Sequence, residues 1–166
     1  MGSKEDLFLG LEAVTPALRR YARALCAGAD ASVADDIVQT AADRVAAQIR
    51  GRDLREDSQT RAAAYRLLTS TAREKLHGLV AARPALRQPA ILHGLADLPF
   101  EERAVLLLVA LEGFSYDLAA EAVGTSREAI VMRLMRARAA LATIDLRTPA
   151  PTNSLRRAGP HLRVVK

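Results

Sequence analysis

Two capped helical segments on either side of Gly124 constrain the fold of this chain most strongly. Ser115 is placed to cap a short helix that runs to about Val123, and Gly124 supplies a turn. Thr125-Ser126-Arg127-Glu128 then has the Thr-x-x-Glu pattern of a capping box. This order predicts a helix-turn-helix over about residues 115–141, in which the second helix presents its first turns to a DNA major groove. Its apolar residues repeat at steps of four and three: Ile130, Leu134, Ala137, Leu141 and Ile144.

Three further helices are predicted in the first half of the chain. Thr15-Pro16 is typical of an N-cap followed by proline at the first helical position, and the helix it opens ends near Gly28. Ser32 opens a capping box for a helix that reaches about Arg50, and Ser58 is placed to cap a third. Aromatic residues make up only 4% of the chain, and alanine, leucine and arginine dominate it. An all-α fold is therefore expected.

Helix-breaking residues divide the chain into two small helical lobes. Two prolines and two glycines occur in residues 78–96, which we interpret as a linker with room for one short helical piece. Asp97-Leu98-Pro99 is a helix-start signal, and Gly113 is a natural stop for the apolar helix that follows. The predicted organisation is a helical domain at 1–77, the linker at 78–96, a helix-turn-helix domain at 97–146 and a flexible basic tail at 147–166.

The net charge is weak evidence for nucleic-acid binding. The whole chain carries +5, and the tail at 147–166 alone accounts for that value with 5 Lys/Arg and no acidic residue. The segment at 51–95 is more informative, because it holds 8 Lys/Arg against 4 Asp/Glu and lies partly on a predicted helix. A local excess of positive charge is what a phosphate backbone would meet.

Several classes of function are disfavoured by the sequence. No apolar run is long enough to span a membrane, and the first residues lack the apolar core of a secretory signal, so we expect a cytoplasmic protein without membrane insertion. The single cysteine, Cys26, has no ligand partner at metal-binding spacing and is expected to be a small, half-buried apolar residue. His77, His93 and His161 have no paired nucleophile, and no phosphate-cradling glycine motif occurs. We therefore expect that the chain is not an enzyme and that it has no catalytic residue, metal or cofactor.

Both lobes carry longer motifs. The second lobe reads LPFEERAVLLL at 98–108, EGFSY at 112–116, Ala119-Ala120, and RLMRAR at 133–138. These stretches resemble the fourth region of bacterial extracytoplasmic-function (ECF) RNA polymerase sigma factors. The first lobe reads LRRYARAL at 18–25 and ADDIVQT at 34–40, which resemble the second region of the same family. The resemblance covers roughly residues 14–77 and 96–142.

The resemblance implies a sigma factor that directs core RNA polymerase to specific promoters. In that family the second region docks on the polymerase clamp and engages the −10 element, while the fourth region reads the −35 element. Arginines of the second lobe would neutralise phosphates, which gives affinity without sequence information. The implied polymerase contacts are Asp35, Asp36, Gln39 and Asp43. The implied DNA contacts are Arg66, Ser70, Arg73, Thr125, Ser126, Arg127, Arg133, Arg136 and Arg138. An ordinary solvated helix face is the alternative for both sets.

Three departures from the family pattern fall on expected DNA contacts. Glu128-Ala129 stand where the family usually has Gly-Thr. Met132 and Met135 lie with Glu128 opposite the core, and exposed methionines suit a protein partner as well as thymine methyls. The family commonly has a tryptophan near Ala63, whereas Tyr65 is the only aromatic residue of this stretch. Stacking on aromatic side chains holds flipped bases with about 1–3 kcal/mol per base, so a single aromatic residue offers a weak stacking surface for bases of the −10 element.

These departures leave a second interpretation open. They resemble the sigma-like domains of alphaproteobacterial general-stress-response regulators, which imitate a sigma factor and capture its anti-sigma factor by partner switching. Under this alternative, Glu128, Met132 and Met135 are the candidate anti-sigma contacts. The basic segment with Arg66 and Arg73 favours DNA, whereas the methionine face favours a protein. An anti-sigma factor is therefore an expected partner under either interpretation.

Overall fold

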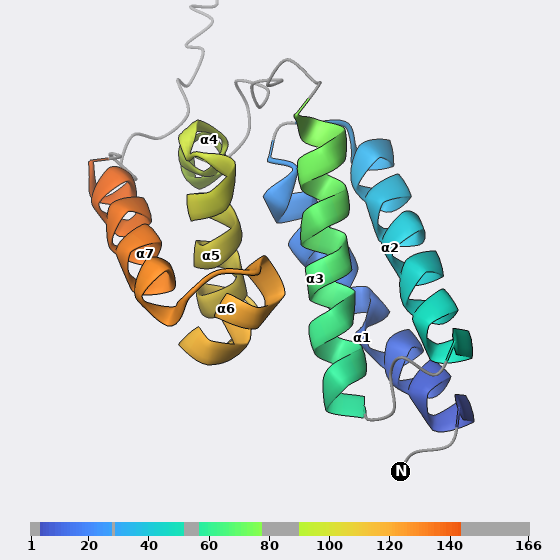
Figure 1. Ribbon diagram of the computed structural model, residues 1–166. Coiled ribbons are helices and arrows are strands. Elements are labelled where there is room, and N and C mark those ends of the chain that lie inside the picture. Colours follow the sequence, from blue (N-terminus) through green and yellow to red (C-terminus); the bar gives the residue numbers. More distant parts are fainter. Residues whose placement is uncertain (1–3, 28, 52–56, 78–89, 144–166) are drawn as a thin grey trace, which may run out of the picture.

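The computed structural model describes residues 4–27, 29–51, 57–77 and 90–143, and all regular structure within them is α-helical (Figure 1). The predicted all-α fold is confirmed. The segment predicted to be a flexible tail, Gly28, His161, Ile144 and most of the predicted linker lie outside the described residues. The helices are α1 (Lys4–Leu25), α2 (Ala31–Gly51), α3 (Asp57–Leu76), α4 (Ala90–Asp97), α5 (Phe100–Ala110), α6 (Tyr116–Val123) and α7 (Arg127–Ala142).

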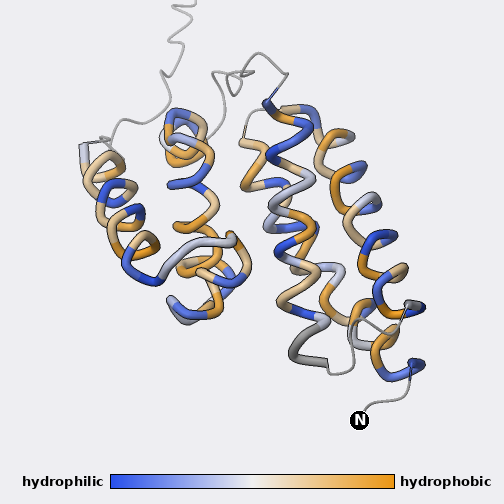
Figure 2. Tube along the Cα trace, in the orientation of Figure 1, coloured by the Kyte–Doolittle hydropathy of each residue, from blue (hydrophilic) through white to orange (hydrophobic). Residues whose placement is uncertain are grey.

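The first lobe is a bundle of α1, α2 and α3, each of which packs against the other two (Figure 1). Polar and apolar residues alternate along these helices, as expected for amphipathic helices that bury one face (Figure 2). Tyr21 and Thr69 place two hydroxyl groups in this core, and their oxygens lie 3.0 Å apart, so neither buried hydroxyl is left unpaired. The largest fully buried apolar side chains of the lobe are Leu18, Leu25, Ile37, Val45, Ile49 and Leu68.

Helix α1 begins eleven residues before the predicted cap, so the prediction of an N-terminus at Thr15-Pro16 is wrong. Pro16 lies inside the helix instead. The reason is an apolar repeat that continues upstream: Leu7 and Leu11 are both buried and extend the same stripe. Burial of two leucines, at about 1.5–3 kcal/mol each, offsets the roughly 3 kcal/mol cost of an internal proline. Thr15 donates its hydroxyl to the Leu11 carbonyl over 2.9 Å rather than capping a helix.

Two other starts differ by a single residue from the predicted caps. Helix α2 begins at Ala31, before Ser32, and the Val33 amide donates to the Asp30 carbonyl over 3.0 Å. Helix α3 begins at Asp57, before Ser58. Shifts of this size are usual for helix ends, where local capping preferences compete. The last part of the predicted linker forms α4, whose Leu95 is buried, which explains why this segment is helical rather than extended.

The second lobe contains the predicted helix-turn-helix as α6 and α7. Ser115 caps α6 by accepting a hydrogen bond from the Leu118 amide, and Gly124 ends that helix with φ of 72°. The predicted capping box at Thr125 is wrong, because Ser126 is the residue that caps α7. Thr125 is still engaged in closing α6, since its amide donates to the Ala120 carbonyl over 3.0 Å.

The two lobes pack directly against each other. Helix α3 packs against α6, and α1 packs against α5; the second lobe lies beside α3 (Figure 1). Phe114, from the loop before α6, is buried against Tyr65 of α3 with ring centroids 4.7 Å apart. Arg103 of α5 donates to the Leu25 carbonyl at the end of α1 over 3.0 Å, where a positive charge meets the negative end of the helix. One hydrophobic core therefore runs through both lobes.

Candidate nucleic-acid interface

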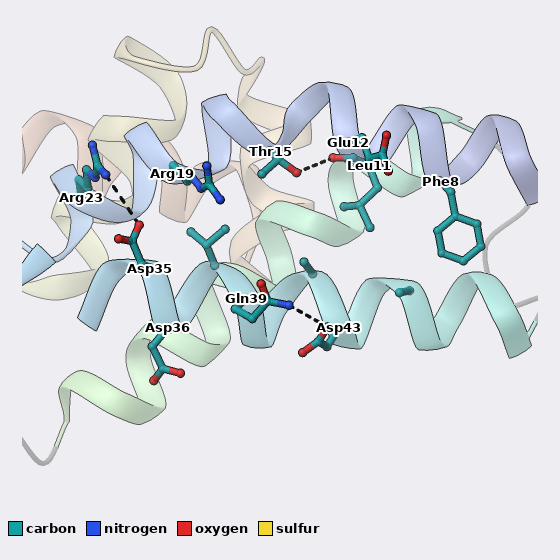
Figure 3. A pocket seen from close by; sticks show the side chains of 13 residues that line it. Phe8, Leu11, Glu12, Thr15, Arg19, Arg23, Asp35, Asp36, Gln39 and Asp43 are labelled. Carbon is teal, nitrogen blue, oxygen red and sulfur yellow. Dashed lines mark hydrogen bonds and ion pairs between the residues drawn. The ribbon is translucent and has the colours of Figure 1, made fainter. Parts of the chain in front are cut away.

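The four residues expected to contact polymerase are exposed on α2. All of them border a groove of about 950 Å³ between α1 and α2 (Figure 3). The α1 wall of this groove is apolar near its N-terminal end, at Phe8 and Leu11, and basic further along, at Arg19 and Arg23. A groove with an apolar end and charges of both signs is suited to a protein surface. The α2 wall carries Asp35, Asp36, Gln39 and Asp43.

The polar groups of this groove are tied only weakly to one another. Asp35 lies 3.8 Å from the Arg23 guanidinium, and the Gln39 side-chain amide donates to Asp43 over 3.1 Å. Asp36 points away from α1 and pairs with Lys75 of α3 (Figure 3). Exposed pairs of this kind contribute only about 0–1 kcal/mol, so an incoming partner can replace them at little cost.

The three expected DNA contacts on α3 differ in their exposure to solvent. Arg66 is exposed, whereas Ser70 and Arg73 are half-buried. The Ser70 hydroxyl donates to the Leu67 carbonyl over 3.0 Å. Arg73 donates to both carboxylate oxygens of Glu101 on α5, over 2.7 and 3.2 Å. The structure therefore leaves Arg66 open to solvent and turns Arg73 toward the other lobe.

Tyr65 is part of the core between the lobes. It is 1% exposed and makes edge contacts with the rings of Tyr21 and Phe114. Its phenol donates to the Glu112 carboxylate over 2.5 Å. Burial, with this bond to the carboxylate, raises the pKa of Tyr65 well above its usual range. In this arrangement the ring is not available for stacking on a base, and neighbouring Ala63 is also buried.

The start of α7 presents the first group of expected DNA contacts. Ser126 and Arg127 are exposed and Thr125 is half-buried. The Ser126 hydroxyl accepts from the Ala129 amide over 3.2 Å, and Arg127 lies 3.7 Å from Asp117. The N-terminus of a helix attracts phosphate through its free amides and dipole, so the chemistry of this end fits a nucleic acid.

The three arginines further along α7 do not share one environment. Arg136 and Arg138 are exposed. Arg133 is half-buried and lies 3.2 Å from Glu101, the same carboxylate that holds Arg73. The structure therefore brings Arg133 together with Arg73 rather than with the two exposed arginines.

The methionine face of α7 is open to solvent. Met132 and Met135 are 51% and 61% exposed, so two large apolar side chains meet solvent on the same helix. Glu128 is also exposed, and hydrogen bonds from its own backbone amide and from Ser126 lower the pKa of its carboxyl. It therefore stays ionised near the N-terminus of α7, where its charge is favourable to the helix and unfavourable to a phosphate.

The carboxylate of Glu112 joins the two lobes and was missed by sequence reasoning. Its side chain is only 2% exposed, and it accepts from Arg20 at distances of 3.0–3.2 Å and from Tyr65. Arg61 adds a bond to the Glu112 carbonyl over 3.3 Å and lies 5.0 Å from the Phe114 ring centroid. Arg20 is 92 positions away in the chain, so no local spacing could reveal the pair.

Two kinds of feature are absent from the described residues. They contain no group of three or more His, Cys, Asp and Glu side chains that could hold a metal ion. Within the described helices, none has the length and apolar character needed to cross a membrane.

Comparison with known proteins identifies the second lobe. Residues 89–141 match the family model described as Sigma-70, region 4. This range contains α4 to α7 except for the last residue of α7, Ala142. No curated protein matches the chain. Among solved structures, the sigma factor RpoE in complex with the anti-sigma factor NepR from Bartonella quintana is similar, with a TM-score of 0.61 and 23% sequence identity. The match covers 82% of this chain and 94% of that chain, and it shows a common fold.

Proposed function

We propose that the chain is a member of the sigma-70 family and acts as an ECF-type sigma factor that directs core RNA polymerase to specific promoters. The observation that carries the proposal is the capped helix-turn-helix of α6 and α7 inside the matched residues 89–141, with Ser126 and Arg127 exposed at the start of α7. This is the end of a recognition helix that meets base edges in the major groove. Its place of action is the cytoplasm.

The α1–α2 groove is the proposed docking surface for polymerase. Asp35, Asp36, Gln39 and Asp43 offer exposed acceptors on one helix, and the weak pairs they make leave them free to exchange partners. Arg136 and Arg138 are proposed to meet phosphates beside the −35 bases. Arg66 is the proposed phosphate contact of the first lobe.

Transcription in vitro tests this function. The full chain, mixed with core RNA polymerase and a genome-wide library of promoter fragments, is expected to start transcription from a small set of fragments. The double variant Asp36→Asn with Gln39→Ala tests the docking surface. It should reduce polymerase binding while the helical content measured by circular dichroism stays unchanged. Transcripts from no fragment at all would rule out the proposed function.

A second function is favoured by one observation, the exposure of Met132 and Met135. In a sigma mimic these side chains and Glu128 would bind an anti-sigma factor, and the similar sigma factor from Bartonella quintana was solved in complex with one. The anti-sigma factor would then compete with promoter DNA for α7. Binding of an anti-sigma protein by an ECF-type sigma factor is compatible with promoter use at other times.

Met132→Asp tests the second function. A carboxylate in an apolar contact would remain buried and unpaired, so anti-sigma capture should be lost. Capture that persists in this variant would remove the reason for assigning a protein contact to that face. Leu9→Asp is the matched control, because Leu9 is an apolar side chain on α1 that is 63% exposed, and its substitution changes the charge in the same way away from α7.

A further inference from the structure

Arg127 and Asp117 form an ion pair between the two helices of the helix-turn-helix. Arg127 is the first residue of α7, and Asp117 is the second residue of α6. The two helices pack against each other across the turn at Gly124 (Figure 1), and the Arg127 Nε atom lies 3.7 Å from an Asp117 carboxylate oxygen. Both side chains are exposed, so the pair contributes little to the stability of the fold. Its position at the start of the proposed recognition helix therefore calls for another explanation.

We propose that Asp117 is a positioning residue for sequence readout, which orients the Arg127 guanidinium toward a guanine of the −35 element. The inference rests on the proposed function, in which the start of α7 meets base edges. Arginine makes its most specific contact with a base through two hydrogen bonds, to guanine O6 and N7. This contact requires the planar guanidinium to face the base edge with two of its N–H groups.

The geometry of the pair leaves the outer part of the Arg127 guanidinium free for a base. The Asp117 carboxylate lies nearest to Nε, which is the guanidinium nitrogen closest to the backbone. The two terminal nitrogens carry the remaining N–H groups and can donate to both guanine acceptors. Ordering a long side chain at an interface costs conformational entropy. A carboxylate on the neighbouring helix reduces that cost, because it favours one direction of the guanidinium before DNA arrives.

Contact with DNA strengthens the pair. In the free chain, solvent screens the two charges, since the side chains are 61% and 75% exposed. A base edge that covers Arg127 displaces part of this water, and attraction between opposite charges increases as the local dielectric constant falls. The ion pair is therefore weak in the free chain and stronger in the complex, where orientation of the arginine matters.

The charge of Asp117 also has a cost for DNA binding. The first helix of a helix-turn-helix crosses the DNA backbone, and a carboxylate in its first turn repels phosphates. Capping does not explain the residue, because Ser115 caps α6 by accepting a hydrogen bond from the Leu118 amide. The proposal therefore predicts two opposite effects of Asp117. It lowers the affinity for DNA of any sequence, and it raises discrimination in favour of guanine at one position.

The test measures base preference and affinity separately in the full chain. Duplexes are selected from a pool with a random segment, both by the free chain at low salt and by the chain mixed with core polymerase. The position read by Arg127 is the one whose guanine preference disappears in Arg127→Ala. Asp117→Asn removes the charge, and Asp117→Glu keeps it. Glu121→Gln is the matched control, because Glu121 is an exposed carboxylate one turn further along α6 and its substitution changes the net charge in the same way.

Asp117→Asn should reduce the guanine preference at this position about tenfold, which lies within the discrimination that a bidentate arginine provides. Its affinity for duplexes without that guanine should equal or exceed that of the original chain. Asp117→Glu should keep most of the preference, and Glu121→Gln should keep all of it. Circular dichroism checks that each variant keeps its helices.

Three results would overturn the inference. The first is an unchanged guanine preference in Asp117→Asn. The second is an equal loss of preference in Glu121→Gln, and the third is an equal weakening of binding to all duplexes in Asp117→Asn, which indicates a structural role. A pool in which no guanine preference depends on Arg127 has the same consequence. Transcription with core polymerase is followed separately. If the chain starts no transcription, the proposed function fails, while the base preference of the free chain still decides the inference.

Discussion

The Arg73 guanidinium on α3 and the Glu101 carboxylate on α5 are joined by two hydrogen bonds, over 2.7 and 3.2 Å. The arginine comes from the lobe expected to engage the −10 element, and the glutamate comes from the lobe expected to read the −35 element. A paired arrangement of this kind has good geometry for a charge-assisted contact, although partial exposure screens it. The pair therefore acts on the availability of Arg73 for phosphate more than on stability.

Glu101→Gln should steepen the salt dependence of DNA binding. The substitution releases Arg73 and Arg133 together, and each new phosphate contact adds about −0.9 to the slope of log affinity against log salt. We expect a change of between about one and two contacts, measured by titration at several salt concentrations. Glu102→Gln is the matched control on the next position of α5. A slope identical in the two variants would mean that Arg73 and Arg133 do not reach DNA when freed.

Arg136→Ala and Arg138→Ala should flatten the same salt dependence by about one contact each, because both side chains are exposed on α7. Arg133→Ala is the internal comparison. It should change the slope much less in the free chain, because Glu101 already holds its guanidinium. An effect of Arg133→Ala as large as that of Arg136→Ala would contradict the environment assigned to Arg133.

Local periodicity explains which parts of this fold could be predicted. The repeat of Ile130, Leu134 and Ala137 predicted α7, and all three side chains are buried. Thr125 failed as a cap because its amide completes the end of the preceding helix, a competition between two motifs that share a residue. Pro16 failed as a start because apolar contacts further upstream outweigh its local preference.

The ion pairs between the lobes could not be predicted, for a different reason. Arg66 and Arg73 lie at regular helical spacing on α3, yet Arg66 is exposed whereas Arg73 is half-buried and paired with Glu101 of α5. A polar stripe indicates only that a helix face is not core. Whether water, DNA or a second lobe covers it depends on how the lobes pack, and the contact between Arg20 and Glu112 spans 92 positions of the chain.

Tyr65→Phe should destabilise the chain more than Tyr21→Phe. The Tyr65 phenol donates to the Glu112 carboxylate, and hydrogen bonds to charged groups contribute about 1.5–3 kcal/mol, whereas Tyr21 shares a neutral bond with Thr69 that contributes about 0.5–1.5 kcal/mol. The free energy of unfolding in urea, followed by circular dichroism, measures both. Equal losses would mean that Glu112 is already satisfied without the phenol. Tyr116→Phe, at a half-exposed position, is the control.

Cys26 should be almost unreactive in the folded chain. It is 4% exposed, and burial raises the pKa of its thiol to about 11 against the opposing charge of Arg103. The thiolate is the reactive form, so a thiol reagent near neutral pH should modify the native chain at least about 100-fold more slowly than the urea-unfolded chain. Rapid labelling without denaturant would show that the end of α1 opens readily.

The same shift predicts a loss of stability at alkaline pH. Because the folded-state pKa lies above the ordinary thiol value, the folded chain holds the proton more tightly than the unfolded chain does. The stabilisation is complete below the ordinary thiol pKa and declines as the pH rises toward about 11. Cys26→Ala should remove this part of the decline, measured as urea midpoints across that range. Any remaining decline in Cys26→Ala belongs to Tyr21 and Tyr65, since burial also raises the pKa of both phenols. If the original chain and the alanine variant lose stability in parallel, the thiol does not ionise on unfolding.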